Sequence, residues 1–239
     1  MSTRTPASPD LTPSHLAGWA VNSHLAVEGI YAKANNPMQN NDAALSRFLS
    51  ENGTDFIAWY AAQLKKVGPP PSTRKVAVAH EVGHAVIAMS LGGTTTDVSV
   101  YRDSRGRWCG WTETSWPPSV EQRIVKVLED PLEATHAALT TIAGLIGEEI
   151  AGLGHPASSP DEMYRVVQAA VTVAHFKRLD AEELLARVMH DARQRILLNQ
   201  GLFKAIRRSL NATDTLPTAA IMALVEQHGV VQVPLKAAW

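Results

Sequence analysis

The sequence of 239 residues has one cysteine, Cys109, no long apolar run and no excess of one charge. A single cysteine excludes a disulfide within the chain and is typical of a reducing compartment. No run of roughly 18 uncharged apolar residues occurs and the N-terminus lacks an apolar signal-peptide core, so we expect a cytoplasmic protein without membrane contact. The net charge of -1, from 22 basic and 23 acidic side chains, gives no field that favours nucleic acid.

The first third of the chain differs in composition from the rest. Residues 1 to 12 are rich in Ser, Thr and Pro and predict a disordered tail. Residues 13 to 71 repeat Leu and Val at helical spacing and predict short N-terminal helices. The "GPPPS" segment ends them because consecutive prolines cannot continue a helix, and Ser72 or Thr73 can cap the next one. We therefore place a domain boundary here, with the main domain at 72 to 239.

The main domain is expected to be mainly α, with one small antiparallel β-hairpin. The segment "TTTDVSVYRDSRGRWCGWTETSW" alternates around a turn at "DSRG" and predicts strands near 96 to 102 and 107 to 114. The hairpin carries three tryptophans, which either pack beneath a loop or form a rim that contacts substrate: Trp108, Trp111 and Trp116. Apolar periodicity, Pro and Gly predict helices at 74 to 91, 118 to 129, 131 to 152, 161 to 178, 181 to 199, about 200 to 210, and 217 to 228.

The motif "HEVGH" at residues 80 to 84 predicts a metal site. At 3.6 residues per turn, His80 and His84 project from one face of a helix, close enough for both imidazoles to bind one zinc ion. Glu81 can then reach a water molecule at the metal and serve as the general base. The flanking segments "VAVA" and "AVIAMSLG" are apolar on all sides, so the helix is expected to be buried. Gly83 is costly inside a helix, which indicates that another backbone or a substrate approaches closely there.

A catalytic zinc ion usually has a third protein ligand. Motif and spacing alone leave four candidates in and after the helix that ends "GLIGEEIAGLGHPASSPDEM": Glu148, Glu149, His155 and Asp161. The other histidines, His136 among them, lack a partner at ligand spacing and are interpreted as ordinary side chains.

From residue 72 to about 228 the sequence resembles the zinc peptidase domain of the FtsH family of AAA proteases. The metal helix "KVAVAHEVGHAVIAMSLG", the hairpin "DVSVYRDSRGRWCGWTE" with Gly110 and Thr112, and the helix "TIAGLIGEEIAG" carry the resemblance. The segment "SSPDEMYRVVQAA" is similar to the one that bears the family's third ligand, and "ARQRILLNQGLFKAIRRSL" and "DTLPTAAIMALV" are similar to its closing helices.

The resemblance implies a ligand set and a mode of substrate binding. It implies His80, His84 and Asp161 as zinc ligands, and makes Glu148 and Glu149 local partners rather than ligands. It also implies that the substrate lies extended beside a strand, which points to the 96 to 102 edge. Either a homo-oligomer, as the family's peptidase domains form, or a separate ATPase partner is expected.

The predicted function is an ATP-independent zinc metalloendopeptidase that hydrolyses unfolded or extended polypeptides through a zinc-activated water, with Glu81 as general base. Residues 1 to 73 contain no G-x-x-x-x-G-K-[ST] loop, so this chain is expected to act without ATP hydrolysis of its own. The alternative is a non-proteolytic binding or regulatory module that keeps the zinc. Glu81 argues against the alternative, since a structural zinc site needs no general base.

Overall fold

The computed structural model describes residues 70–117, 131–155, 158, 159, 162, 166 and 181–235. In these residues the fold is mainly α with a small antiparallel sheet, which confirms the predicted fold class. The helices are α4 (Arg74–Ser90), α6 (Pro131–Ile150), α8 (Ala181–Leu198), α9 (Gln200–Thr213) and α10 (Thr218–His228), and the strands are β1 (Thr94–Arg102), β2 (Trp108–Ser115) and β3 (Thr215–Pro217). The predicted tail at 1 to 12, the helical extension through residue 69, the helix at 118 to 129 and most of the helix at 161 to 178 lie outside the described residues. None of the described helices has the length and apolar character needed to cross a membrane.

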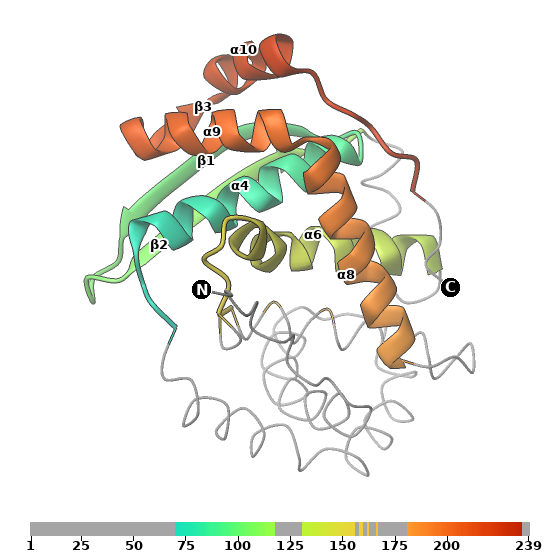
Figure 1. Ribbon diagram of the computed structural model, residues 1–239. Coiled ribbons are helices and arrows are strands. Elements are labelled where there is room, and N and C mark those ends of the chain that lie inside the picture. The colour runs from blue at the N-terminus through green and yellow to red at the C-terminus, as the bar shows by residue number, and fades with distance from the viewer. Residues whose placement is uncertain are drawn as a thin grey trace, which may run out of the picture.

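Helix α4 lies at the centre of the described fold, between α9 and α6 (Figure 1). The hydroxyl of Thr73 caps its N-terminus by accepting a hydrogen bond from the backbone N–H of Val76 at 3.3 Å. Its other end stops at Gly92, whose φ of 89° is readily adopted only by glycine. Apolar side chains on all faces of α4 are fully buried, Val78 and Val82 among them, which confirms the predicted burial.

Two glycines let α4 and α6 pack backbone against backbone. A β-carbon on Gly83 would lie 2.2 Å from the carbonyl oxygen of Ala143, and one on Gly147 would lie 2.4 Å from the carbonyl oxygen of Ala79. Neither fits, because such atoms need more than 3 Å. The close backbone approach predicted at Gly83 is therefore confirmed, and it brings the side chains of α6 next to the "HEVGH" segment.

The sheet covers another side of α4 and has the order β2-β1-β3, antiparallel throughout. Val98 in β1 is paired on both sides, with Thr112 of β2 and with Leu216 of β3. The sequence analysis did not predict β3, and this strand occupies the far edge of β1. The prediction that the 96 to 102 edge receives a peptide is therefore wrong for residues 97 to 99, which pair with β3. Among the described strands, β2 forms the outer edge on the opposite side of the sheet from β3.

Long-range polar contacts tie the end of the chain to both ends of α4. At the N-terminal end, Arg74 donates hydrogen bonds to the carboxylate of Asp214, one of them at 2.8 Å. At the C-terminal end, the backbone N–H of Val233 donates to the carbonyl oxygen of Ser90 at 3.1 Å. The buried guanidinium of Arg195 in α8 donates to the carbonyl oxygen of Val233 at 2.8 Å. Both ends of α4 are therefore held by hydrogen bonds to residues that lie more than a hundred positions later in the sequence.

Candidate metal centre

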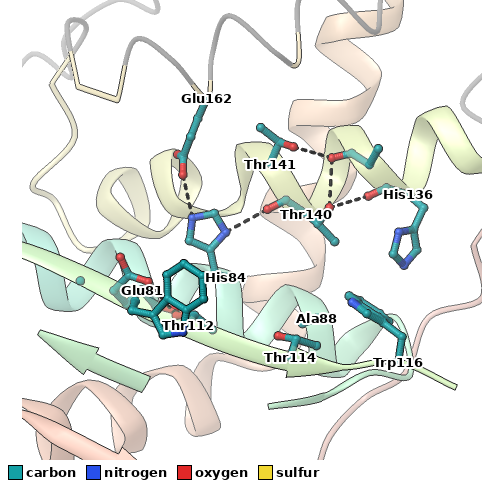
Figure 2. A pocket seen from close by; sticks show the side chains of 13 residues that line it. Glu81, His84, Ala88, Thr112, Thr114, Trp116, His136, Thr140, Thr141 and Glu162 are labelled. Carbon is teal, nitrogen blue, oxygen red and sulfur yellow. Dashed lines mark hydrogen bonds and ion pairs between the residues drawn. The ribbon is translucent and has the colours of Figure 1, made fainter. Parts of the chain in front are cut away.

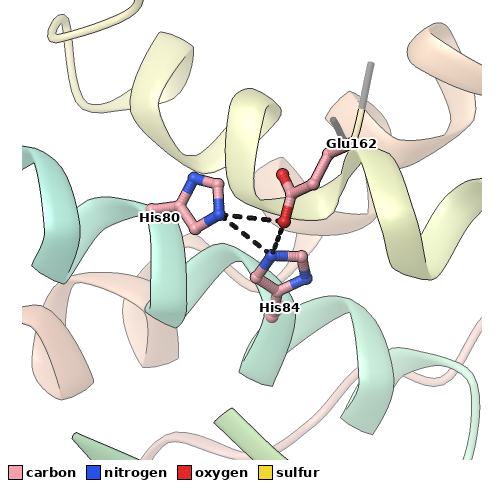
Figure 3. A group of neighbouring side chains, drawn as sticks. All are labelled: His80, His84 and Glu162. Carbon is pink, nitrogen blue, oxygen red and sulfur yellow. Dashed lines mark hydrogen bonds and ion pairs between the residues drawn. The ribbon is translucent and has the colours of Figure 1, made fainter. Parts of the chain in front are cut away.

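Three potential ligand atoms meet where α4 faces the residues that follow α6. Oε1 of Glu162 lies 3.1 Å from Nε2 of His80 and 3.0 Å from Nε2 of His84, and the two Nε2 atoms are 3.2 Å apart. Figure 3 shows the two imidazoles on successive turns of α4 and the Glu162 side chain reaching toward both. These residues form the group that could hold a metal ion among the described residues.

The partners of the other ring nitrogens leave the two Nε2 atoms with free lone pairs. Nδ1 of His84 lies 2.9 Å from the carbonyl oxygen of Thr140, which can only accept, so this nitrogen carries the proton. Nδ1 of His80 lies 2.8 Å from Oε1 of Glu148, and the same reasoning makes it the donor. With both rings neutral, two lone pairs and a carboxylate oxygen therefore point at one another, and either a proton or a metal ion between them relieves the repulsion.

The pKa values of His80 and Glu162 also indicate a site that favours a bound positive charge. Burial acts to lower the pKa of His80, but the hydrogen bonds to Glu148 and Glu162 outweigh it and raise the pKa to about 10. Burial acts to raise the pKa of Glu162, but the hydrogen bonds to His80 and His84 hold it at about 2. Without a metal, a proton on His80 neutralises part of the charge of the two carboxylates. A metal ion would displace that proton.

The donor set fits zinc in both chemistry and spacing. Two imidazoles and one carboxylate are a known ligand set of catalytic zinc sites, which leave a fourth position open. Zinc–ligand bonds of about 2.0 to 2.1 Å in a tetrahedron give ligand atoms about 3.3 Å apart. The three observed separations of 3.0 to 3.2 Å are close to that value. The triad therefore has nearly the shape of one face of a zinc tetrahedron.

The other candidates for the third ligand fall in different places. Asp161 lies outside the described residues, so its assignment stays a prediction. Glu148 is 1% exposed and faces the far side of the His80 ring, where it orients the imidazole as carboxylates commonly do behind metal-bound histidines. Glu149 points away from the two histidines and forms a bidentate ion pair with Arg193 of α8. His155 lines a separate hollow beside the start of α4.

Two further glycines make room for the side chains of His80 and Glu81 on α4. A β-carbon on Gly144 of α6 would lie 2.3 Å from Cε1 of His80, and one on Gly110 of β2 would lie 2.2 Å from Cγ of Glu81. The His80 ring and the Glu81 side chain are thus held in slots between neighbouring backbones. The slots fix where each group points.

Glu81 lies in the same cleft as the triad. The cleft has a volume of about 420 Å³, and both Glu81 and the candidate ligands His84 and Glu162 line it (Figure 2). Oε2 of Glu81 accepts a hydrogen bond of 2.7 Å from the hydroxyl of Thr112 on β2. Burial raises the pKa of Glu81, while His84, His80 and the Thr112 hydrogen bond act to lower it. The net rise makes the carboxylate a stronger base.

The outer edge of β2, which pairs with no described strand, offers backbone hydrogen-bonding groups at this cleft. Along an antiparallel strand, the N–H and C=O of one residue point to the same side, and successive residues alternate. The N–H of Val100, opposite Gly110, points away from β2 toward Asp214, and the N–H of Trp108 points away from β1 to the hydroxyl of Ser72. By this alternation, Gly110 and Thr112 present their N–H and C=O groups on the unpaired side of β2.

The three tryptophans of the hairpin divide between packing and exposure. Trp108 packs beneath the guanidinium groups of Arg74 and Arg102, which lie 5.7 Å and 5.1 Å from its ring centroid. Trp116 packs against His136, and Trp111 is 61% exposed beside the cleft. Packing thus accounts for two of the three, and one is free to contact a substrate.

Comparison of the sequence with models of protein families gives no match, and comparison with curated proteins gives none either. The feature of this cleft that bears on function is a candidate metal site of His80, His84 and Glu162 that adjoins a buried glutamate, Glu81.

Proposed function

We propose that this protein is a zinc-dependent endopeptidase that cleaves extended or unfolded polypeptides, and that it is related to the peptidase domains of the FtsH family. The observation that carries the proposal is the position of Glu81. This carboxylate lines the same cleft as the triad, is held by Thr112, and is not one of the three candidate ligands. A site that only bound zinc for stability would gain nothing from a base placed beside it.

The residues of the site divide the chemistry between them. His80, His84 and Glu162 would hold the ion, and Glu148 and the carbonyl of Thr140 fix the two rings. Zinc, when bound, supplies a Lewis acid that polarises a peptide carbonyl and makes water acidic near neutral pH.

Glu81 takes the proton from the attacking water and passes it to the leaving nitrogen. The hydroxyl of Thr112 holds Oε2 of Glu81, so the carboxylate is positioned before the substrate arrives. This hydrogen bond restricts the directions in which the Glu81 carboxylate can point.

The free edge of β2 supports a polypeptide as the substrate. A peptide that pairs with the backbone groups of Gly110 and Thr112 would run as an additional strand along the cleft. Such pairing needs an extended backbone and uses no side chain of the peptide. We therefore propose that unfolded segments are cleaved in preference to folded proteins, without ATP hydrolysis by this chain, either in a homo-oligomer or beside a separate ATPase.

The central test replaces Glu81 by glutamine. The Glu81→Gln variant should keep about one zinc per chain, because the ligands are intact, and should cleave a denatured labelled protein about 10²- to 10⁴-fold more slowly, the usual contribution of a general base. Glu113→Gln is the matched control, since Glu113 is an exposed glutamate on the same strand as Thr112. Equal inactivity of wild type and Glu81→Gln, with zinc bound to both, would favour the non-proteolytic zinc module.

The third ligand is tested separately by two neighbouring substitutions. We expect Glu162→Ala to lose most of its zinc, measured by mass spectrometry on protein purified without a histidine tag, and Asp161→Ala to keep it. The reverse result would assign the ligand to Asp161. Absence of zinc from the wild type even after reconstitution would contradict the metal site itself.

A further inference from the structure

The cleft extends past the candidate metal site to an end that carries no charge. There it runs between α6 and the end of β2 (Figure 2). The charged residues among its described lining, Glu81 and Glu162, are both at the metal end. The far end is lined by small, hydroxyl-bearing and ring side chains: Ala88, Thr114, Trp116, His136, Ala137 and Thr141.

His136 is the unusual member of this lining. It is 5% exposed, and its ring packs edge-on against Trp116 with the centroids 4.5 Å apart and an interplanar angle of 70°. Its Nε2 is buried, and no described residue gives it a hydrogen bond. Burial and the charge of Arg195 lower the pKa of His136 to about 4, so the ring is neutral at pH 7. A neutral imidazole nitrogen that has lost its contact with water lacks a partner for one hydrogen bond.

We propose that this end of the cleft is a specificity subsite that binds a tyrosine side chain next to the cleaved peptide bond, with His136 as its hydrogen-bond partner. The proposal rests on the peptidase function proposed above. Ala88 and Ala137 leave room for a ring, and Trp116 offers an aromatic surface to pack against it. Nε2 of His136 is enclosed in the unbound protein, so the hydrogen bond requires the ring to turn about its Cβ–Cγ bond toward the cleft. A phenol can donate or accept, so it suits either tautomer of His136.

Other side chains match this lining less well. A charged side chain would lose its hydration, and no described residue that lines this end of the cleft carries a charge to offset the loss. Phenylalanine would fill the same volume but leave Nε2 of His136 unpaired. Sites built to hydrogen-bond a substrate hydroxyl discriminate strongly against the analogue that lacks it. The comparison of tyrosine with phenylalanine is therefore the sharpest test.

The test measures binding rather than cleavage. Two fluorescent peptides of identical small, uncharged sequence, one with a single tyrosine and the other with phenylalanine in its place, are titrated with the zinc-loaded Glu81→Gln protein and followed by anisotropy. We expect the tyrosine peptide to bind about tenfold more tightly or better, which corresponds to about 1.4 kcal/mol. His136→Phe should abolish this preference, and His190→Phe, which changes an exposed histidine of α8, should keep it.

A second variant keeps the proposal testable if His136→Phe does not fold. Ala137→Leu narrows the same end of the cleft and should weaken both peptides to a similar degree. Zinc content and melting temperature identify variants that have kept the fold.

Equal affinity for the two peptides in the wild-type subsite would overturn the proposal. So would a tyrosine preference that survives in a folded His136→Phe, or a failure of both peptides to bind. The subsite and the peptidase function can also fail independently. Cleavage of denatured protein without tyrosine at the cut sites would keep the peptidase and discard the subsite, whereas tyrosine-selective binding by a wild type that cleaves nothing would keep the subsite alone.

Discussion

Replacement of Glu148 by glutamine tests how far the second carboxylate supports the metal. Glu148 is 1% exposed, and its Oε1 accepts the Nδ1–H of His80 at 2.8 Å. A glutamine oxygen can still accept this hydrogen bond, so the ring should keep its orientation. The negative charge behind the imidazole is lost, however, and the basicity of the ligand falls with it.

The expected effect is a loss of about 10- to 100-fold in zinc affinity, the range found for such outer partners, or about 1.4 to 2.7 kcal/mol. The assay is a competition for zinc with a chromogenic chelator at pH 7. Glu149→Gln is a close control because it makes the same chemical change at the adjacent residue, whose carboxylate is paired with Arg193 near the surface. A Glu148→Gln affinity within about twofold of wild type, or an equal loss in Glu149→Gln, would refute the reasoning.

Three further predictions concern close contacts and protons. Gly83→Ala should destabilise the protein by about 1 to 3 kcal/mol because its methyl group meets a carbonyl of α6. Gly201→Ala should stabilise it by up to about 1 kcal/mol, because its methyl group meets Nδ1 of His228 at an ordinary contact distance of 3.7 Å and the helix propensity rises. Urea denaturation of both variants measures these changes in the free energy of unfolding. Gly110→Ala should displace Glu81, lowering kcat at least tenfold with zinc content unchanged; a kcat close to wild type would contradict the close contact. Zinc binding at pH 7 should release about one proton, because carboxylates raise the pKa of His80 to about 10 in the metal-free site. The apparent zinc affinity should therefore rise with pH. Calorimetry in buffers of different ionisation enthalpy measures the number of protons released.

Local signals in the sequence predicted most of the described fold. The helix predicted at 74 to 91 is Arg74–Ser90, and the strands predicted near 96 to 102 and 107 to 114 are Thr94–Arg102 and Trp108–Ser115. Apolar periodicity, glycines and a polar turn mark these ends. β3 has three residues and no periodicity, and its pairing with β1 comes from a segment more than a hundred positions away. The error about the free edge follows from that missed strand.

The sequence predicted the part of the site that lies on a single helix, α4. The spacing of His80 and His84 on α4 made them candidate partners for one ion, and the structure brings their Nε2 atoms together. Glu162 was missed because adjacent residues of a helix point about 100° apart, and sequence alone does not show which acidic residue of the Asp-Glu pair faces α4. The only available signal was its position beside Asp161. His136 gave no signal at all, since its burial against Trp116 is a tertiary contact.

The contacts at both ends of α4 have a consequence for synthesis on the ribosome. This helix buries apolar side chains on most of its surface, yet Asp214 and Val233, which hold its two ends, are made long after it. Until those residues emerge, α4 lacks part of its packing and leaves apolar surface exposed to chaperones. The cleft beside Glu81 cannot reach its final shape before the closing helices dock. The packing around this cleft is therefore completed only after residue 233 has left the ribosome.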